Sequence, residues 1–159
     1  GLVQNLNSSV TNSPFFNVFL ASQVKTNDKG FLSRDITVAD LLSHRGDIHH
    51  IFPRNYLKKN GLERGKYNQI ANYVITQQEI NIKLGSKSPL EYFTQLIEQV
   101  HNGGLKYGGI ESESELHENL ALNCIPELAI QGVVDVYETF LGQRRVLMAK
   151  KIKAYYYSL

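Results

Sequence analysis

Apolar positions recur at helical spacing along most of the chain, and each run is bounded by residues that start or stop helices. Ser13-Pro14 and Ser88-Pro89 each place a capping serine before a proline at the first helical position. The apolar runs behind these two signals predict helices. Further runs predict helices over about residues 38–44, 116–123 and 133–156. Residues 1–12, rich in Asn and Ser, predict an irregular lead-in.

Two short apolar runs have a strand-like pattern instead. The first is Asp47-Ile48-His49-His50-Ile51-Phe52-Pro53, which follows a helix break at Arg45-Gly46, and the second is Tyr73-Val74-Ile75. A capping-box motif that begins at Thr76 then predicts a short helix ending near Gly85. We therefore expect an α+β fold, mostly α-helical, in which helices brace one small two-stranded element.

Composition fits a single globular domain over residues 1–159. The 42% of hydrophobic residues and 20% of charged residues allow a sizeable core. The single cysteine, Cys124, excludes an internal disulfide framework and a zinc site built on paired cysteines, and it favours a reducing, cytoplasmic setting. No apolar run reaches the length of a membrane span, so we expect no membrane partner. The chain opens on Gly1 without a starting methionine, and we expect it to be part of a longer protein.

The adjacent residues His49 and His50, behind Asp47, are the strongest candidates for a chemical site. Hydrolysis of a phosphodiester requires a base that activates water and positive charge that stabilises the reacting phosphate. An imidazole with a pKa of about 6.5 suits the first task, and we assign it to His50. A single divalent ion, Mg²⁺ or Mn²⁺, suits the second task, and we expect His49 and Asn81 to bind it. Asp47 is expected either as a third ligand or as the partner that orients an imidazole.

The position of Asn81 also calls for a functional reason, because asparagine is a mediocre helix former and Asn81 lies inside a predicted helix. Neighbouring residues of a flat strand face opposite ways, so His49 and His50 can serve one site only if the strand bends or ends there. Pro53 favours such a departure. The interpretation therefore requires that both histidines and Asn81 line one cavity.

The segment between His50 and Asn72 is predicted to be loop-rich, and it is strongly basic. Five basic residues stand against one acid, Glu63, so the local excess is five minus one, or +4. These basic residues are Arg54, Lys58, Lys59, Arg64 and Lys66. Such residues are common on any solvated surface, but beside the histidines we favour a rim that attracts DNA phosphates. Lys83 is a further candidate for a phosphate contact, whereas the basic residues of the last helix, Arg144 among them, are expected on a solvated face.

The order of these residues resembles the motif of the HNH nucleases, which belong to the ββα-metal or His-Me finger group. The resemblance rests on Asp-x-His-His-Ile-x-Pro, a loop, and then Asn72 and Asn81. It implies that His49 and Asn81 bind the metal ion and that His50 is the catalytic base. It also implies that Asn72 belongs to the catalytic site by tying the loop to the base, within a finger core of about residues 45–85.

The wider chain is similar to the C-terminal nuclease half of GmrSD-type proteins, the modification-dependent restriction endonucleases of bacteria. This similarity covers nearly all of the chain, including segments 15–24, 30–47 and 144–149. It implies DNA as the substrate, and a ParB-like nucleotide-binding half, missing here, as the N-terminal partner. The oligomeric state stays open. An alternative function is a non-catalytic DNA-binding or assembly module that retains the HNH scaffold. A structural zinc site is a third, with a poor ligand count in the absence of paired cysteines.

Overall fold

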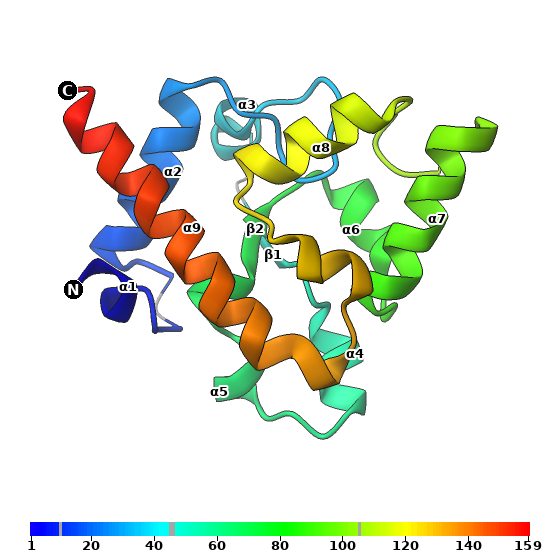
Figure 1. Cartoon of the computed structure of the whole chain (residues 1–159), viewed down its shortest axis with the longest axis horizontal. Helices are drawn as coiled ribbons and strands as arrows, with labels where there is room; N and C mark the ends of the chain where they lie inside the picture. Colours follow the sequence, from blue (N-terminus) through cyan, green and yellow to red (C-terminus); the bar gives the residue numbers. More distant parts are fainter. Residues whose placement is uncertain (10, 45–46, 105) are drawn as a thin grey trace.

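A two-stranded antiparallel sheet lies near the middle of the molecule, with helices around it (Figure 1). The computed structural model describes residues 1–9, 11–44, 47–104 and 106–159, so the helix break expected at Arg45-Gly46 lies outside the described residues. Most of the described residues are helical, which confirms the expected α+β, mostly α-helical fold class.

The helices precede, connect and follow the two strands. The α-helices are α1 (Leu2–Asn5), α2 (Pro14–Lys25), α3 (Val38–Ser43), α4 (Arg54–Lys59), α5 (Arg64–Tyr67), α6 (Gln78–Leu84), α7 (Pro89–Asn102), α8 (Glu113–Leu122) and α9 (Tyr137–Tyr157). Short 3₁₀ helices are η1 (Ile70–Asn72), η2 (Glu127–Gln131) and η3 (Val134–Val136). No helix among the described residues has both the length and the hydrophobicity needed to cross a bilayer.

Helices α2 and α7 start as their sequence signals indicate. The Ser13 hydroxyl accepts a hydrogen bond from the backbone of Phe15 at 3.2 Å, and that of Ser88 accepts one from Glu91 at 3.1 Å. Helix α6 differs, because it begins at Gln78 with Gln77 at the N-cap position, so the capping box expected at Thr76 is wrong. The Thr76 hydroxyl donates to the carbonyl of Phe31 at 2.6 Å instead.

Two segments expected to be irregular contain helices. Residues 1–12 hold α1, and Leu6 directly after it is fully buried. The basic segment after His50 holds α4, α5 and η1. Leu57 and Tyr67 anchor this segment in the core, so buried apolar contacts order a stretch whose polar composition suggested a loop.

The strands β1 (Ile48–His50) and β2 (Tyr73–Ile75) pair over three residues, with His49 opposite Val74 and His50 opposite Tyr73. A strand pair of this length is too short to be stable alone. Phe52, just after β1, packs its ring against those of Tyr137 and Phe140, at centroid distances of 5.1 and 4.8 Å. The pair is therefore stabilised by the helices.

Side chains of α7 and α9 also bind the backbone around the strands. The Tyr92 hydroxyl donates to the carbonyl of Ile51 at 2.7 Å, and the Tyr137 hydroxyl donates to that of Lys66 at 2.7 Å. Both tyrosines are almost completely buried. These bonds satisfy the carbonyl of the residue after β1 and a carbonyl of α5.

Arg144 of α9 forms hydrogen bonds with the backbone of β2 and of the turn before it. It is 1% exposed, so the solvated position expected for it is wrong. Its Nη1 donates to the carbonyls of Ala71 and Tyr73 at 3.0 and 2.6 Å, and its Nη2 donates to that of Asn123 at 3.1 Å. Carbonyl groups thus replace the water that a surface arginine would bind.

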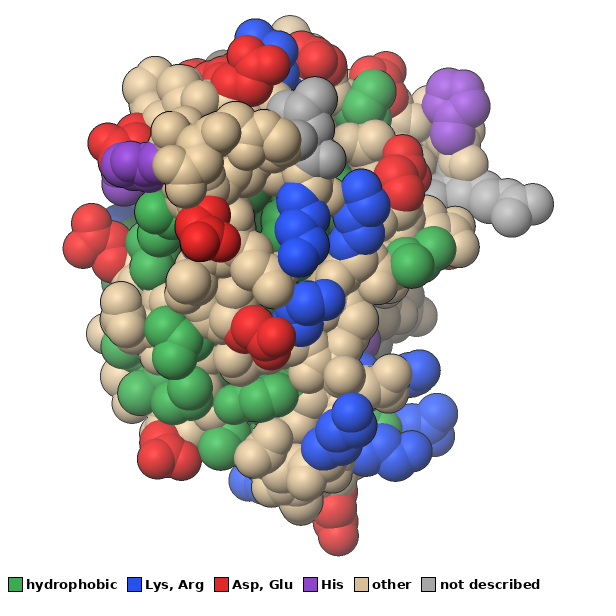
Figure 2. Space-filling model, turned by 90° about the vertical axis from the view of Figure 1, so that its right-hand side faces the viewer, with side chains coloured by type: hydrophobic (Ala, Val, Ile, Leu, Met, Phe, Trp, Pro, Cys, Tyr) green, Lys and Arg blue, Asp and Glu red, His purple; other side chains and the backbone are tan. Residues whose placement is uncertain are grey.

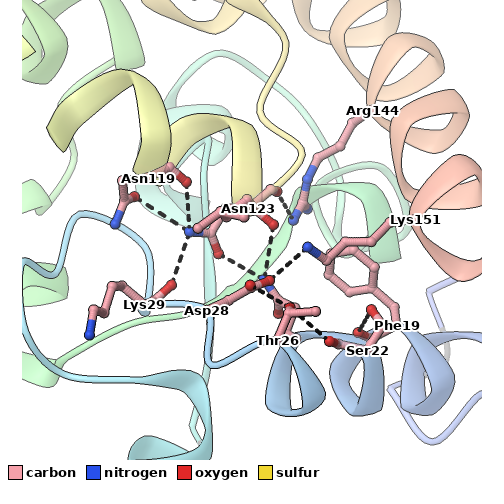
Figure 3. A network of polar contacts seen from close by, with 11 residues as sticks. Phe19, Ser22, Thr26, Asp28, Lys29, Asn119, Asn123, Arg144 and Lys151 are labelled. Carbon is pink, nitrogen blue, oxygen red and sulfur yellow. Dashed lines mark hydrogen bonds and ion pairs between the residues drawn. The ribbon is translucent and has the colours of Figure 1, made fainter. Parts of the chain in front are cut away.

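Arg144 belongs to a larger buried polar network that joins α2, α8 and α9 (Figure 3). Lys151 forms an ion pair with the fully buried carboxylate of Asp28 at 2.7 Å. Asn123 donates to the carbonyl of Lys29 at 3.2 Å. Two basic side chains of α9, those of Arg144 and Lys151, therefore point inward, where they bind buried oxygen atoms.

Candidate functional site

A cavity of about 360 Å³ opens beside the strands. Its lining comes from β1, from the start of α4 and from α6 with the residue that ends it. The lining residues are Ile48, His49, His50, Pro53, Arg54, Asn55, Asn81, Ile82 and Gly85. The cavity thus brings together both histidines and Asn81, residues that lie more than thirty positions apart in the chain.

Both histidines line the cavity although they are neighbours on a strand. β1 ends at His50, and the chain bends at Ile51 and Phe52 before α4 begins. This departure from the extended strand meets the geometric requirement stated for the pair.

The imidazole of His49 carries a polar atom without a partner. Its Nε2 is buried and has no hydrogen bond among the described residues. Burial lowers the pKa of His49 below its ordinary value, while the negative charge of Asp47 acts in the opposite direction. The neutral form of His49 is therefore favoured near pH 7, and a neutral imidazole carries a lone pair on one of its two ring nitrogens.

His50 is more strongly constrained than His49. Its Nε2 lies 2.8 Å from Oδ1 of Asn68, and its ring packs edge-on against the rings of Tyr67 and Tyr73. Burial lowers the pKa of His50; the hydrogen bond to Asn68 raises it, and the charges of Arg54 and His49 lower it further. A neutral imidazole is the form that can accept a proton from water.

Asn81 reaches the cavity from the second turn of α6. Its side chain is partly exposed and forms no hydrogen bond with any described residue. Gly85 ends the helix with φ of 54°, a left-handed conformation in which a side chain would be strained. The helix therefore stops directly at the cavity, leaving the Asn81 carboxamide free to bind a ligand.

Asp47 and Asn72 do not line the cavity. Asp47 is exposed at the start of β1 and affects His49 through its charge. Asn72 is fully buried; its Oδ1 accepts from the backbone of Phe52 at 2.8 Å, and its Nδ2 donates to the carbonyls of Phe52 and Tyr67 at 3.0 and 3.2 Å. Asn72 thus ties together the two ends of the segment that follows His50.

The residues around the cavity offer a divalent ion few protein ligands. No group of three or more His, Cys, Asp or Glu side chains suited to a metal occurs in the described ranges. A metal bound here would draw on His49 and Asn81 and would complete its shell with water or phosphate oxygens. Mg²⁺ keeps several waters when proteins bind it and prefers oxygen ligands, whereas an imidazole nitrogen is a ligand that transition metals prefer.

The basic residues named from the sequence lie at different distances from the cavity. Arg54 lines it, and Lys59 donates to the hydroxyl of Ser86, next to the lining residue Gly85, at 3.2 Å. Lys66 lines a separate depression with acidic neighbours, and Lys83 lines an open depression against α7. The two others, Lys58 and Arg64, are exposed outside these depressions.

The face at the right of Figure 1 carries most of its Lys and Arg side chains in two groups, one at the height of α6 and one lower, at the height of α4, with further basic atoms at the top edge (Figure 2). Acidic side chains interrupt the upper group and the surface to its left. Positive charge therefore gathers on this face in patches, and the cavity-lining guanidinium of Arg54 is the one best placed to meet a bound phosphate.

Asn68 is the residue of this site that sequence reasoning missed. It contacts His50 across 18 positions and lies at the C-cap of α5, a helix that the composition of the segment did not indicate. An asparagine after a tyrosine has no distinctive pattern, so only the folded chain identifies it.

No protein-family model matches the chain, and no solved structure matches it. One similar protein is an uncharacterised protein of Methanocaldococcus jannaschii, which is 35% identical over 57 residues. The match covers 36% of this chain and 10% of that protein, so the chain spans only a small part of its relative's length.

Proposed function

We propose that this chain is a metal-dependent nuclease domain that hydrolyses DNA phosphodiester bonds. In this proposal β1, β2 and α6 form the ββα unit of an HNH nuclease, in the setting of a bacterial restriction system of the GmrSD type. The single observation that carries it is the common cavity that His49, His50 and Asn81 line.

The two histidines have separate tasks in the reaction. His50 accepts a proton from water, the water oxygen bonds to phosphorus, and the bond from phosphorus to the leaving oxygen breaks with its electron pair on that oxygen. His49 and Asn81 hold the divalent ion, Mg²⁺ or Mn²⁺. When bound, that ion supplies positive charge that stabilises the phosphate and the departing oxygen. Arg54, at the edge of the same cavity, attracts the phosphate before reaction.

The pKa directions support this division of tasks. Burial lowers the pKa of both histidines, which keeps a free lone pair on each ring at neutral pH. A base must be unprotonated to accept a proton, and a metal ligand must be unprotonated to bind. The burial that lowers both pKa values therefore suits both the base and the metal ligand.

Cleavage of supercoiled plasmid with Mg²⁺ or Mn²⁺ tests the proposal. We expect His50→Ala to lower the rate at least about 100-fold, the usual contribution of a general base, while its circular dichroism spectrum stays that of the wild type. The matched control is His101→Ala, because His101 is exposed and pairs with Glu113 away from the cavity. Equal rates for His50→Ala and the wild type would remove His50 from the mechanism.

Mn²⁺ titration by calorimetry separates the nuclease from the non-catalytic alternative. We expect the wild type to bind Mn²⁺ and both His49→Ala and Asn81→Ala to weaken binding. A chain that binds DNA but neither binds Mn²⁺ nor cleaves would be a DNA-binding or assembly module, and the nuclease proposal would be wrong.

A further inference from the structure

The contact between His50 and Asn68 is specific in its chemistry. The Nε2 of His50 lies 2.8 Å from the carboxamide oxygen of Asn68, which can only accept a hydrogen bond. Nε2 must therefore carry the ring proton in the neutral imidazole. The other nitrogen, Nδ1, has no hydrogen-bond partner among the described residues and is left with the lone pair.

Hydrogen bonds of its own backbone and of the two residues before it fix the position of Asn68. Its backbone N–H donates to the carbonyl of Arg64 at 3.0 Å, which ends α5. The carbonyl of Tyr67, the residue before it, accepts from Asn72 at 3.2 Å, and that of Lys66 accepts from the Tyr137 hydroxyl at 2.7 Å. Main-chain motion that would carry Asn68 away from His50 would break these bonds.

Asn72 joins the two ends of the segment that runs from His50 to Asn68. Asn72 exchanges two hydrogen bonds with Phe52, two residues after His50, and donates to Tyr67, one residue before Asn68. One buried side chain therefore sets the separation of the base and the residue that contacts it. This arrangement explains why a site with a short strand can hold an imidazole in one orientation.

We propose that Asn68 is a positioning residue that fixes the ring orientation and the tautomer of His50, so that Nδ1 is the nitrogen that accepts the proton from water. The role in cleavage rests on the proposed nuclease function, whereas the tautomer itself does not. A neutral amide suits this task, because it binds Nε2–H without adding a full negative charge beside the base. The imidazolium formed on proton transfer keeps the same hydrogen bond to Asn68, so the ring need not reorient.

Nitrogen-15 NMR of the histidine rings tests the tautomer directly. At about pH 8, where the ring is neutral, we expect His50 of the wild-type chain to be protonated at Nε2. Asn68→Ala should give a mixture of tautomers, and Asn68→Asp, which keeps an accepting oxygen, should restore the Nε2–H form. A His50 ring protonated at Nδ1 in the wild type, or a tautomer ratio unchanged in Asn68→Ala, would overturn the inference.

The matched control is Asn60→Ala. Asn60 is the C-cap residue of α4 and donates to the carbonyl of Tyr56 at 2.8 Å, so it resembles Asn68 in place but does not contact His50. We expect it to leave the His50 spectrum unchanged. If Asn68→Ala does not fold, the wild-type and Asn68→Asp spectra still decide between the two tautomers.

Kinetics then test the role in cleavage. We expect Asn68→Ala to lower kcat by about 10-fold to 100-fold with KM unchanged, because proton transfer slows while substrate binding does not. A tautomer that changes as expected with no change in kcat would overturn the catalytic part of the inference. Failure of the nuclease proposal is seen separately, as undiminished cleavage by His50→Ala.

Discussion

Asn72 and Phe52 exchange two hydrogen bonds through the buried side chain of Asn72. Its Oδ1 accepts from the backbone N–H of Phe52 at 2.8 Å, and its Nδ2 donates to the carbonyl of the same residue at 3.0 Å. A side chain here imitates the pairing of a strand neighbour, just beyond the point where β1 ends. The segment that carries the proposed base therefore keeps a sheet-like partner.

Removal of this side chain should be costly. Asn72→Ala leaves the backbone N–H of Phe52 buried without a partner, and we expect it to lower the free energy of unfolding by about 2–4 kcal/mol. Urea denaturation measures this change. The control, Asn17→Ala, truncates an exposed asparagine in α2 and should stay within about 0.5 kcal/mol of the wild type. A loss for Asn72→Ala as small as that of the control would show that the two bonds contribute little.

The role of Arg144 gives a second prediction. Arg144→Met leaves the carbonyls of Ala71, Tyr73 and Asn123 without their donor, so we expect a loss of about 3 kcal/mol in the free energy of unfolding. Lys150→Met makes the same kind of exchange on the exposed side of α9 and should change stability by less than about 0.5 kcal/mol. Equal losses in both variants would mean that Arg144 acts through its apolar stem alone.

The pH dependence of stability follows from the histidines. Burial holds the pKa values of His49 and His50 below the value of about 6.5 expected in the unfolded chain. The unfolded chain therefore binds more protons between these values, and the stabilisation present above about pH 6.5 is lost as the pH falls through the folded pKa values. We expect the free energy of unfolding to decrease from pH 8 to about pH 5.5.

Urea denaturation of the wild type and of His50→Ala at both pH values measures this dependence. The variant should lose less stability on acidification, because one of the two rings is gone. The lowered pKa values of the Asp40 and Glu115 carboxyl groups act below about pH 4.5 and do not interfere. Identical losses in the two proteins would contradict the assignment to His50.

DNA binding should distinguish the basic residues by position. Arg54 lines the cavity, so we expect Arg54→Ala to weaken binding of a DNA duplex and to reduce the slope of log K against log salt by about 1. Lys66 lines a different depression beside Glu63 and Glu138, and Lys66→Ala should have a smaller effect on the slope. Fluorescence anisotropy in Ca²⁺, at several salt concentrations, provides the measurement. A larger effect for Lys66→Ala would place the DNA path along the depression that Lys66 lines.

Local sequence signals predicted much of the fold. Serine caps before proline set the starts of α2 and α7, and the apolar runs located both strands. The shared cavity of His49, His50 and Asn81 agrees with the geometric requirement drawn from the motif. The residues that end β1 and α6 lie close to these side chains in the sequence. The sequence was sufficient to predict those elements whose formation depends on residues close to them in the chain.

Other features depend on contacts between distant residues, and the sequence did not predict them. Arg144 has the composition of a surface residue, and its burial depends on carbonyl groups 21 to 73 positions away. Likewise α4 and α5 depend on the burial of Leu57 and Tyr67 against other elements. Asn68 contacts His50 in a segment whose two ends Asn72 joins. Single-sequence patterns carry no information about such partners.

Because of the hydrogen bonds from α7 and α9, we expect that β1, β2 and α6 would not keep their fold when separated from the rest of the chain. Tyr92, Tyr137 and Arg144 donate to backbone carbonyls between Ile51 and Tyr73, and all three donors lie outside residues 45–85. A peptide of that length, or a graft into another scaffold, would leave these acceptors unsatisfied and the ring of Phe52 uncovered. Recombination that preserves the proposed catalytic unit has to move it together with the chain up to the end of α9.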